Sequence, residues 1–435
     1  MDLKNKTVSV IGIGNSGFNA CCLLHDLGAL VKATDASDGS SVRSNAKKLE
    51  DKGIDVEIGR HTEGFIRGSD LVVISPGVEN SSPAIKWAKS NRIPIMGEME
   101  LGSRFCKGKI IGITGTNGKS TVTTLIGEIL KDGGLDAVVC GNIGNSLCGE
   151  ISRIKDDTWV VLEVSSFQLE TINSFKPYIA LILNITDDHM DRYSNFDEYF
   201  NEKIKIFANQ DERDILILNY DAKNLRNLKD QAGSKVYFYS KSDKANGSYD
   251  IKIKGLHNLE NVLASVLIGR LAGVEEDSMR RTIASFKGLR HRIELVDTVD
   301  GVEYIDDSKG TTVDSTYRAL EACDRPVVLI AGGKDKHSDY SYVKDIVKKK
   351  VKDLVLIGEA TAAIKKALEG SVKIHEAKDM SEAVSMAHGL AKKGWSVLLS
   401  PMCSSFDMFS SYKERGDVFR KAVGSLKESG RSVKV

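Results

Sequence analysis

The chain has 435 residues, enough for about three domains of ordinary size, and 41% of its residues are hydrophobic, enough for several buried cores. Lysine and arginine number 61 against 60 for aspartate and glutamate, so the net charge of +1 argues against a nucleic-acid-binding protein, whose phosphate contacts need a basic surface. The seven cysteines include no Cys-x-x-Cys pair, which argues against a disulfide framework or a zinc site. A reducing compartment fits this pattern better.

The N-terminal residues run directly into a strand-like segment and lack the apolar core of a signal peptide. No apolar run approaches the length needed to cross a bilayer, about 20 residues. We therefore expect a cytoplasmic protein with no membrane partner.

Short β-branched segments alternate with longer helical segments along the whole chain, which predicts an α/β fold with mainly parallel sheets. In the first part of the chain, we expect strands at residues 7–13, 30–34 and 71–74. A helix is expected at 17–27. Residues 93–97 are typical of a strand that ends at a domain boundary.

A glycine-rich turn, Gly12-Ile13-Gly14-Asn15-Ser16-Gly17, lies between the first strand and the first helix. Asp35 follows Gly17 by 18 residues (35 − 17), at the end of the second strand. This spacing is typical of the dinucleotide-binding fingerprint, in which glycines let the backbone approach a pyrophosphate at a helix N-terminus. The residues alone leave three interpretations open: a dinucleotide, another diphosphate ligand, or a tight turn that only packs helix on strand.

The central part of the chain has strands expected at 109–114, 159–162 and 180–185. Helices are expected at 119–130 and 258–271, the second with Asn258 at its start, as helix N-termini prefer.

Residues 112–121, Gly-Ile-Thr-Gly-Thr-Asn-Gly-Lys-Ser-Thr, form the most specific motif of the chain. The motif follows a predicted strand and opens a predicted helix, as a P-loop does. Its backbone N–H groups can surround the phosphates of ATP, its lysine can reach the β and γ oxygens, and a hydroxyl can bind Mg²⁺. The ATP-binding residues predicted here are Gly115, Thr116, Asn117, Gly118, Lys119, Ser120 and Thr121.

Acidic and histidine side chains follow two other central strands. Glu163 ends one buried strand, where it suits a metal ligand or a helix cap. Residues 187–193, Asp-Asp-His-Met-Asp-Arg-Tyr, follow another, as part of a site or as an aspartate-rich turn. Ligands of open α/β sheets bind beyond the carboxyl ends of the strands, which favours the site.

The last part of the chain follows the basic residues 290–292. We expect strands at 302–305, 327–331, 354–357 and 397–399, separated by helices. The predicted organisation is a Rossmann-like N-terminal domain, a central P-loop ATPase-like domain with a mostly parallel sheet, and a C-terminal Rossmann-like domain. The expected boundaries are 1–97, 98–297 and 298–435.

With these motifs the chain resembles the Mur ligases, whose ATP loop reads Gly-Thr-Asn-Gly-Lys-Ser/Thr. Residues 163–170, Glu-Val-Ser-Ser-Phe-Gln-Leu-Glu, and 188–193, Asp-His-Met-Asp-Arg-Tyr, are similar to the branch of that family that adds D-glutamate. The resemblance covers essentially the whole length. It continues through residues 257–261, 289–292, 307–311, 332–336 and 400–407.

The resemblance implies an ATP-dependent amide-bond ligase of peptidoglycan precursor synthesis. The carboxylate of UDP-N-acetylmuramoyl-L-alanine would attack the γ-phosphate of ATP, and the amine of D-glutamate would attack the resulting acyl phosphate, leaving ADP and phosphate. Its cofactors would be ATP and Mg²⁺. A monomer is expected, with small-molecule substrates and no nucleic-acid partner.

The resemblance also implies site residues. The first glycine loop would bind the UDP part of the substrate, through Gly14, Asn15, Ser16, Asp35, Ala36, Ser75, Pro76 and Gly77, with Asn142 and Gln168 on the muramoyl side. The adenine nucleotide would contact Asn258, Asn261, Arg292, Asp307 and Lys309. Glutamate would contact Thr311, Lys336, Ser405, Phe406 and Tyr412.

Two metal sites and four catalytic residues follow from the same resemblance. Ser120 and Glu163 would ligate the first Mg²⁺. His189 and a carbamylated Lys203 would ligate the second. The catalytic residues would be Lys119, Glu163, His189 and Lys203.

Three other functions remain as alternatives. A nicotinamide-dependent dehydrogenase rests on the first glycine loop and Asp35, but it leaves the loop at Lys119 unexplained. A non-enzymatic nucleotide-binding module leaves Glu163, His189 and the last domain without a role. A folylpolyglutamate synthase has the same chemistry, but the two glycine loops and the Ser-Ser-Phe-Gln run favour the cell-wall enzyme. The handedness of the glutamate follows from the family and not from particular residues.

Overall fold

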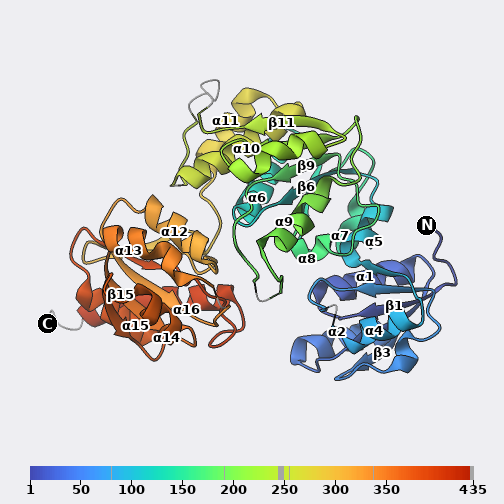
Figure 1. Ribbon diagram of the computed structural model, residues 1–435, viewed down its shortest axis with the longest axis horizontal. Coiled ribbons are helices and arrows are strands. Elements are labelled where there is room, and N and C mark those ends of the chain that lie inside the picture. The colour runs from blue at the N-terminus through green and yellow to red at the C-terminus, as the bar shows by residue number, and fades with distance from the viewer. Residues whose placement is uncertain (80, 191, 243–248, 254, 337, 432–435) are drawn as a thin grey trace. The chain divides into compact units, whose positions relative to one another are not determined.

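The computed structural model describes residues 1–79, 81–190, 192–242, 249–253, 255–336 and 338–431 (Figure 1). Contacts within the chain group the residues into two compact units. The first unit consists of Met1–Ile185, Phe200–Gly247 and Leu263–Thr282, and the second of Thr186–Tyr199, Ser248–Val262 and Ile283–Val435. Asp191, which belongs to the predicted site segment 187–193, lies outside the described residues.

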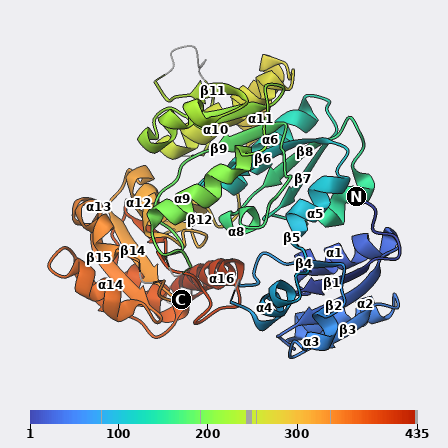
Figure 2. The ribbon, with the colours of Figure 1, turned by 45° about the vertical axis from the view of Figure 1, so that its right-hand side comes forward.

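Five parallel strands form the N-terminal sheet of the first unit, in the order β3-β2-β1-β4-β5 (Figure 2). The strands are β1 Thr7–Ile11, β2 Leu30–Asp35, β3 Asp55–Ile58, β4 Leu71–Ile74 and β5 Ile95–Gly97. The helices are α1 Asn15–Asp26, α2 Ser40–Glu50, α3 Glu63–Ile66, α4 Pro83–Ser90 and α5 Glu98–Phe105.

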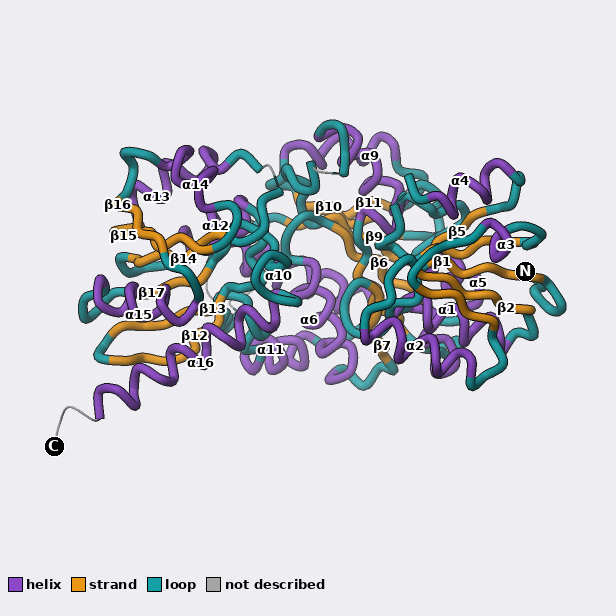
Figure 3. Tube along the Cα trace, turned by 90° about the horizontal axis from the view of Figure 1, so that it is seen from below, coloured by secondary structure: helices purple, strands orange, loops and turns teal. Residues whose placement is uncertain are grey.

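Helices cover both faces of this sheet, because successive residues of a strand point to opposite sides. Val8 and Val10 of β1 pack in one core with Leu24 of α1. Ile11 packs in the other core with Ile85 of α4. Figure 3 shows the two helical layers on either side of the strands. From β1 the chain adds β2 and β3 on one side of the sheet and β4 and β5 on the other, so the topological switch point lies between β1 and β4. Ligands of doubly wound sheets bind at this point.

The central sheet, also in the first unit, has six parallel strands in the order β11-β10-β9-β6-β8-β7. The strands are β6 Lys109–Thr114, β7 Ala137–Gly141, β8 Trp159–Glu163, β9 Ile179–Ile182, β10 Ile215–Asn219 and β11 Lys235–Tyr239. The α-helices that accompany these strands in the sequence are α6 Lys119–Asp132, α7 Leu147–Glu150, α8 Ser166–Leu169, α9 Phe196–Ile204, α10 Leu256–Leu271 and α11 Glu276–Ser285. The 3-10 helices are η1 Ile151–Arg153, η2 Lys205–Phe207 and η3 Lys223–Gln231. Every residue of β8, β9 and β10 is buried, as expected of a parallel sheet that is covered on both faces.

The second unit contains a sheet in the order β12-β13-β17-β14-β15-β16, in which β12 and β13 are antiparallel and the other pairs parallel. The strands are β12 Glu294–Val299, β13 Val302–Asp306, β14 Val327–Gly332, β15 Val351–Ile357, β16 Lys373–Glu376 and β17 Ser396–Leu399. The helices are α12 Val313–Ala322, η4 Tyr340–Val343, α13 Lys344–Lys350, α14 Thr361–Leu368, α15 Met380–Leu390 and α16 Tyr412–Arg431. One core lies under α12 to α14 and another under α15 and α16, so this sheet is also a middle layer.

The prediction of an α/β fold with mainly parallel sheets is confirmed. Strands β3, β7, β10, β11, β12 and β16 are absent from the prediction. Strands β3 and β16 are edge strands of four residues, two of which are charged in each, so they lack the apolar run that marks a buried strand. The predicted capping role of Asn258 is wrong, because α10 begins at Leu256, directly after the left-handed residue Gly255.

None of the helices in the described part of the chain combines the length and apolarity that crossing a bilayer requires.

Candidate active site

The predicted phosphate loop connects β6 to α6. Gly118 caps α6 in the left-handed region, with φ of 89°, and a Cβ atom on Gly115 would lie 3.1 Å from Leu183. Both positions therefore favour glycine. Asn184 fixes the loop: its carbonyl accepts from the N–H of Thr116 at 2.9 Å, and its side chain exchanges hydrogen bonds of 2.8 and 3.0 Å with the backbone of Asn117.

Asn184 explains a difference between the predicted and the observed strand. The prediction continues the strand to residue 185, whereas β9 ends at Ile182. The N–H of Leu183 still donates to the carbonyl of Thr114 in β6 at 3.0 Å, and Asn184 then bonds the phosphate loop instead of a neighbouring strand.

Two lysine amines meet at this loop. Lys119 Nζ donates to the carbonyl oxygens of Gly115 at 2.8 Å and Thr116 at 2.9 Å. Lys203 Nζ donates to the same Gly115 oxygen at 2.9 Å, and Lys203 is only 2% exposed. The N-terminus of α6 adds backbone N–H groups and a partial positive charge. The loop therefore concentrates positive charge and donors where a triphosphate would be attracted.

Glu163 and Asn142 lie at the carboxyl ends of neighbouring strands β8 and β7. Asn142 Nδ2 donates to Glu163 Oε1 at 2.9 Å, and Glu163 is 2% exposed. Ile113, just before the loop, is the register partner of Glu163. Carboxylate and hydroxyl oxygens are ligands that Mg²⁺ prefers, which suits the buried side chains of Glu163 and Ser120, the latter 1% exposed. That the two residues hold one ion stays a prediction.

Gln168 has a local structural role. Its side-chain oxygen accepts from the backbone N–H of Ser165 at 3.0 Å, and its own N–H donates to the Ser165 hydroxyl at 3.4 Å. The two residues form the capping box of α8. The role of Gln168 in substrate binding stays a prediction.

The first glycine loop has the geometry of a diphosphate-binding turn. A Cβ atom on Gly17 would lie 1.7 Å from the carbonyl oxygen of Gly12, so helix and strand approach too closely for any other residue. The carboxylate of Asp35 accepts from the N–H groups of Ile13 and Ser37, both at 2.8 Å. Strands β1, β2 and β4 are adjacent, so their carboxyl ends bring the predicted UDP-binding segments together, namely residues 14–16, 35–36 and 75–77.

In the second unit, Asp188 connects a predicted metal ligand with a predicted glutamate-binding residue. Asp188 Oδ2 lies 3.5 Å from His189 Nε2, and Asp188 Oδ1 lies 3.6 Å from Lys336 Nζ. The side chains of Asp188 and Lys336 are 9% and 15% exposed. Lys203, the other predicted ligand of the second metal, belongs to the first unit, so the compact units divide that ligand pair.

Two of the five predicted nucleotide contacts, Asp307 and Lys309, follow the carboxyl end of β13. Asp307 accepts from the Ser400 hydroxyl at 2.7 Å and from the N–H of Ile293 at 3.3 Å. The amine of Lys309 lies 5.3 Å from the ring centroid of Tyr412, within cation–π range. At the start of α10, Asn261 Nδ2 donates to Asn258 Oδ1 at 3.1 Å. Phe406, predicted to contact glutamate, is 69% exposed.

Asp307 should make stability depend on pH. Burial raises the pKa of its carboxyl group from 3.8 to about 7, and the charge of Arg292 offsets only part of that effect. The folded state therefore binds a proton that the unfolded state releases above pH 4. Relative to Asp307→Asn, the wild type should lose up to about 4 kcal/mol of unfolding free energy as pH rises from 4 to above 7. Denaturant unfolding of both proteins across this range measures the difference, and parallel pH profiles would contradict it.

Two buried residues that the prediction missed join the loops of the predicted glutamate-binding region. Arg415, with no exposed surface, donates to Ser308 Oγ at 3.0 Å, to the Ser308 and Cys403 carbonyls at 2.8 and 3.1 Å, and to the Ser404 carbonyl at 3.2 Å. The Tyr340 hydroxyl donates to Asp335 Oδ1 at 2.7 Å and lies 3.2 Å from Cys403 Sγ. The loops that carry Thr311, Lys336 and Ser405 are thus tied together. The sequence around Arg415 does not show whether this arginine is buried or lies on the exposed face of a helix.

The fold and the phosphate loop together define a class: a chain with three α/β sheets whose central sheet carries a P-loop. The matches to known families agree with the three sheets. Residues 6–97 match the Mur ligase MurD-like N-terminal domain, residues 113–269 the Mur ligase middle domain, and residues 291–403 the Mur ligase glutamate ligase domain. The chain therefore belongs to the Mur ligase family, and the resemblance expected from its motifs is confirmed.

The curated relatives are more specific. The UDP-N-acetylmuramoylalanine--D-glutamate ligase of Koribacter versatilis is 41% identical over 98% of this chain and 99% of that protein. The protein of the same name from Caldanaerobacter subterraneus subsp. tengcongensis is 42% identical over 98% and 100%.

Solved structures share the fold. The UDP-N-acetylmuramate-alanine ligase of Thermotoga maritima matches with a TM-score of 0.63 at 18% identity, over 97% of this chain and 100% of that one. A MurF ligase of the same organism, solved in complex with ADP, matches with a TM-score of 0.60 at 14% identity, over 91% and 95%.

Proposed function

We propose that this chain is an ATP-dependent amide-bond ligase that adds D-glutamate to UDP-N-acetylmuramoyl-L-alanine and releases ADP and phosphate. The phosphate loop, with Lys119 at the start of α6, is the observation that carries this proposal. The names of the relatives at 41% and 42% identity support the choice of substrates.

The reaction requires a carboxylate to approach a triphosphate. Two unit charges about 4 Å apart repel by roughly 4 kcal/mol at an effective dielectric constant of 20, so cations must offset the repulsion. Lys119 is suited to the γ-phosphate. The N–H groups at the start of α6 can hold the other phosphate oxygens without any rearrangement of the loop that Asn184 fixes. Asn142 is suited to the muramoyl side, next to Glu163.

The metal ligands are assigned from the chemistry of the side chains. Ser120 and Glu163 would hold one Mg²⁺, and His189 with carbamylated Lys203 would hold a second. Bound Mg²⁺ would neutralise phosphate charge during transfer. Carbamylation converts the buried amine of Lys203 into an anionic oxygen ligand, which is the type that Mg²⁺ prefers.

The remaining sites follow from the second unit. The nucleotide would contact Asn258, Asn261, Arg292, Asp307 and Lys309. Glutamate has two carboxylates, which need cations and N–H donors. Lys336 and the Ser405 region would supply them, with Thr311, Phe406 and Tyr412 around the amino acid. Lys336 would then exchange its partner Asp188 for a substrate carboxylate.

Direct assay tests the function. The protein is incubated with ATP, Mg²⁺, UDP-N-acetylmuramoyl-L-alanine and each of a panel of amino acids. We expect phosphate release that needs both substrates, an amide product by mass spectrometry, and a preference for D-glutamate. ATP that remains intact with both substrates present would overturn the function, and a preference for L-glutamate would overturn only the stereochemical assignment.

Replacing Lys203 with alanine should lower ligase activity at least tenfold, because a transition-state interaction of about 1.4 kcal/mol or more is removed. Lys205→Ala is the matched control: Lys205 lies two positions further along the chain, is 41% exposed and pairs with Glu202 at 2.7 Å. Initial rates with saturating substrates measure both variants. Full activity of Lys203→Ala would exclude its role as a metal ligand.

A further inference from the structure

The segment that carries Arg292 has an unusual backbone. His291 and Ile293, on either side of Arg292, adopt left-handed conformations with φ of 65° and 45°. This region is unfavourable for any residue with a Cβ atom, and most unfavourable for a β-branched one such as isoleucine. Such backbone strain persists only where surrounding contacts impose it, and it often accompanies functional sites.

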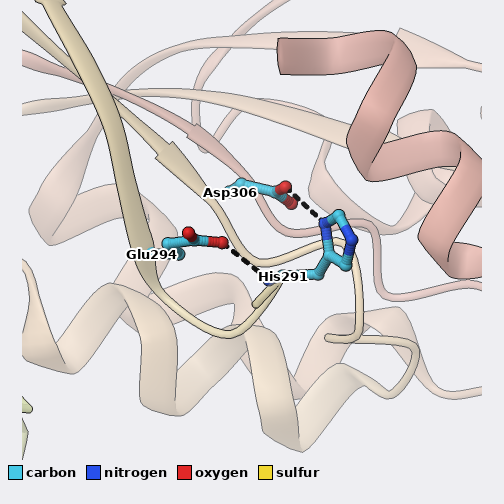
Figure 4. Close-up of side chains that lie close together, drawn as sticks. All are labelled: His291, Glu294 and Asp306. Carbon is cyan, nitrogen blue, oxygen red and sulfur yellow. Dashed lines mark hydrogen bonds and ion pairs between the residues drawn. The ribbon is translucent and has the colours of Figure 1, made fainter. Parts of the chain in front are cut away.

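Hydrogen bonds from His291 impose this conformation. His291 Nδ1 lies 2.7 Å from Asp306 Oδ2, and the backbone N–H of His291 donates to Glu294 Oε2 at 2.9 Å (Figure 4). The carbonyl oxygen of His291 accepts from the N–H of Lys309 at 3.1 Å. His291 is 4% exposed and Asp306 fully buried. The strained segment is thus fastened to the end of β13, where Asp307 and Lys309 follow.

The helix α16 has a glycine, Gly416, where it faces the imidazole ring of His291. A Cβ atom at Gly416 would lie 2.2 Å from His291 Nδ1 and 2.8 Å from Asp306 Oδ2. Glycine at this helical position therefore leaves the space in which the histidine and aspartate meet.

The side chain of Arg292 carries a buried donor that is unused within the described part of the chain. Its Nε atom is buried and has no hydrogen-bond partner among the described residues. Its charge acts on Asp307, whose pKa it lowers against the larger effect of burial. Buried donors without a partner are uncommon, and a bound ligand can complete them.

A metal ion is a weaker interpretation of the same cluster. Ligand atoms of His291, Glu294 and Asp306 lie within 4.8 Å of one another. However, the guanidinium group of Arg420 pairs with Glu294 and lies 3.7 Å from Asp306. The guanidinium group already supplies a positive charge, and His291 Nδ1 is bonded to Asp306. A metal ion would have to displace Arg420 and break the bond between His291 and Asp306.

We propose that His291, held by Asp306, is a positioning residue that orients Arg292 toward the adenine nucleotide. The inference rests on the proposed function, because it takes Arg292 as a nucleotide contact. His291 itself does not touch the substrate. Its loss should therefore weaken ATP binding through Arg292 and leave glutamate binding unchanged.

Steady-state kinetics of His291 variants test the proposal. His291→Ala should raise KM for ATP about tenfold, with KM for glutamate unchanged. His291→Asn keeps a donor near the Nδ1 position and should recover most of the loss, whereas His291→Gln places its donor near Nε2 and should not. The matched control is His375→Ala, which removes another histidine–aspartate contact of the same sheet, 2.9 Å from His375 Nε2 to Asp353 Oδ1, and should leave KM for ATP unchanged. Equal KM values for the asparagine and glutamine variants would overturn the proposal even if the alanine variant does not fold.

A double-mutant cycle tests whether His291 acts through Arg292. In an Arg292→Ala background, the further change His291→Asn or His291→Gln should leave KM for ATP unchanged, because the residue to be oriented is absent. Independent effects of the two changes would overturn the proposal. Wild-type protein without ATP-dependent ligation would instead refute the proposed function, so the two failures are distinguishable.

Discussion

Replacing Lys119 with alanine is expected to lower kcat for ATP-dependent ligation by about a thousandfold. The lysine amine carries a positive charge that can stay bonded to the γ-phosphate during its transfer. Removal of one preorganised donor at such a site lowers the rate by roughly 10²–10³. The amine donates hydrogen bonds to the carbonyls of Gly115 and Thr116. Those carbonyls belong to a loop that Asn184 also holds, so the loop should keep its shape in the variant.

Lys131→Ala is the matched control for this prediction, because Lys131 is an exposed lysine in the last turn of the same helix α6. It should retain wild-type kcat. Phosphate release and product formation are measured with both substrates saturating. An activity of Lys119→Ala within tenfold of the control would contradict the assignment of the loop.

The phosphate loop could be predicted from the sequence because all its determinants lie in one short segment. Gly115 and Gly118 need positive φ, and a strand ends directly before them. The partner that fixes the loop could not be predicted in the same way. Asn184 lies 67 residues from Asn117, and only the pairing of β6 with β9 brings the two together.

In the second unit, too, contacts between residues that lie far apart in the sequence could not be predicted. Asp307 and Lys309 were predicted from the resemblance to the Mur ligases, because both lie in residues 307–311, one of the motifs that carry it. Arg415 reaches Ser308 across 107 residues, and its position in α16 has no sequence feature that marks it as buried. His291 is an intermediate case: its basic neighbourhood was visible, but the contact with Asp306 depends on how β13 and α16 pack.

Edge strands illustrate the physical reason for the missed elements. A central strand of a parallel sheet is buried on both faces and has an apolar sequence, as β8 and β9 do; β10 is equally buried and apolar and was nevertheless missed. Edge strands such as β3 and β16 bear charged residues that keep them from pairing with other chains, so their sequences are similar to those of loops.

Replacing Arg415 with alanine is expected to lower the free energy of unfolding of the second unit by about 3–5 kcal/mol. Burial lowers the pKa of this guanidinium group to about 10, so it remains charged at neutral pH. Its removal leaves the buried carbonyls of Ser308 and Cys403, and the half-buried carbonyl of Ser404, without this donor. Each buried acceptor that loses its partner costs roughly 1–3 kcal/mol. Native-state hydrogen exchange of peptides from β13 and β17 measures the loss within this unit.

Lys413→Ala provides the control, because Lys413 is exposed on the same helix two positions earlier. It should stay within about 0.5 kcal/mol of the wild type, as surface substitutions usually do. Activity gives a second measurement. Because Arg415 ties the segment of Ser308 to that of Cys403 and Ser404, its loss should loosen Thr311 relative to Ser405 and raise KM for glutamate more than KM for the muramoyl substrate. An Arg415→Ala variant as stable as Lys413→Ala would mean that the loops hold their positions without the arginine, and that other contacts such as the Tyr340 hydroxyl to Asp335 suffice.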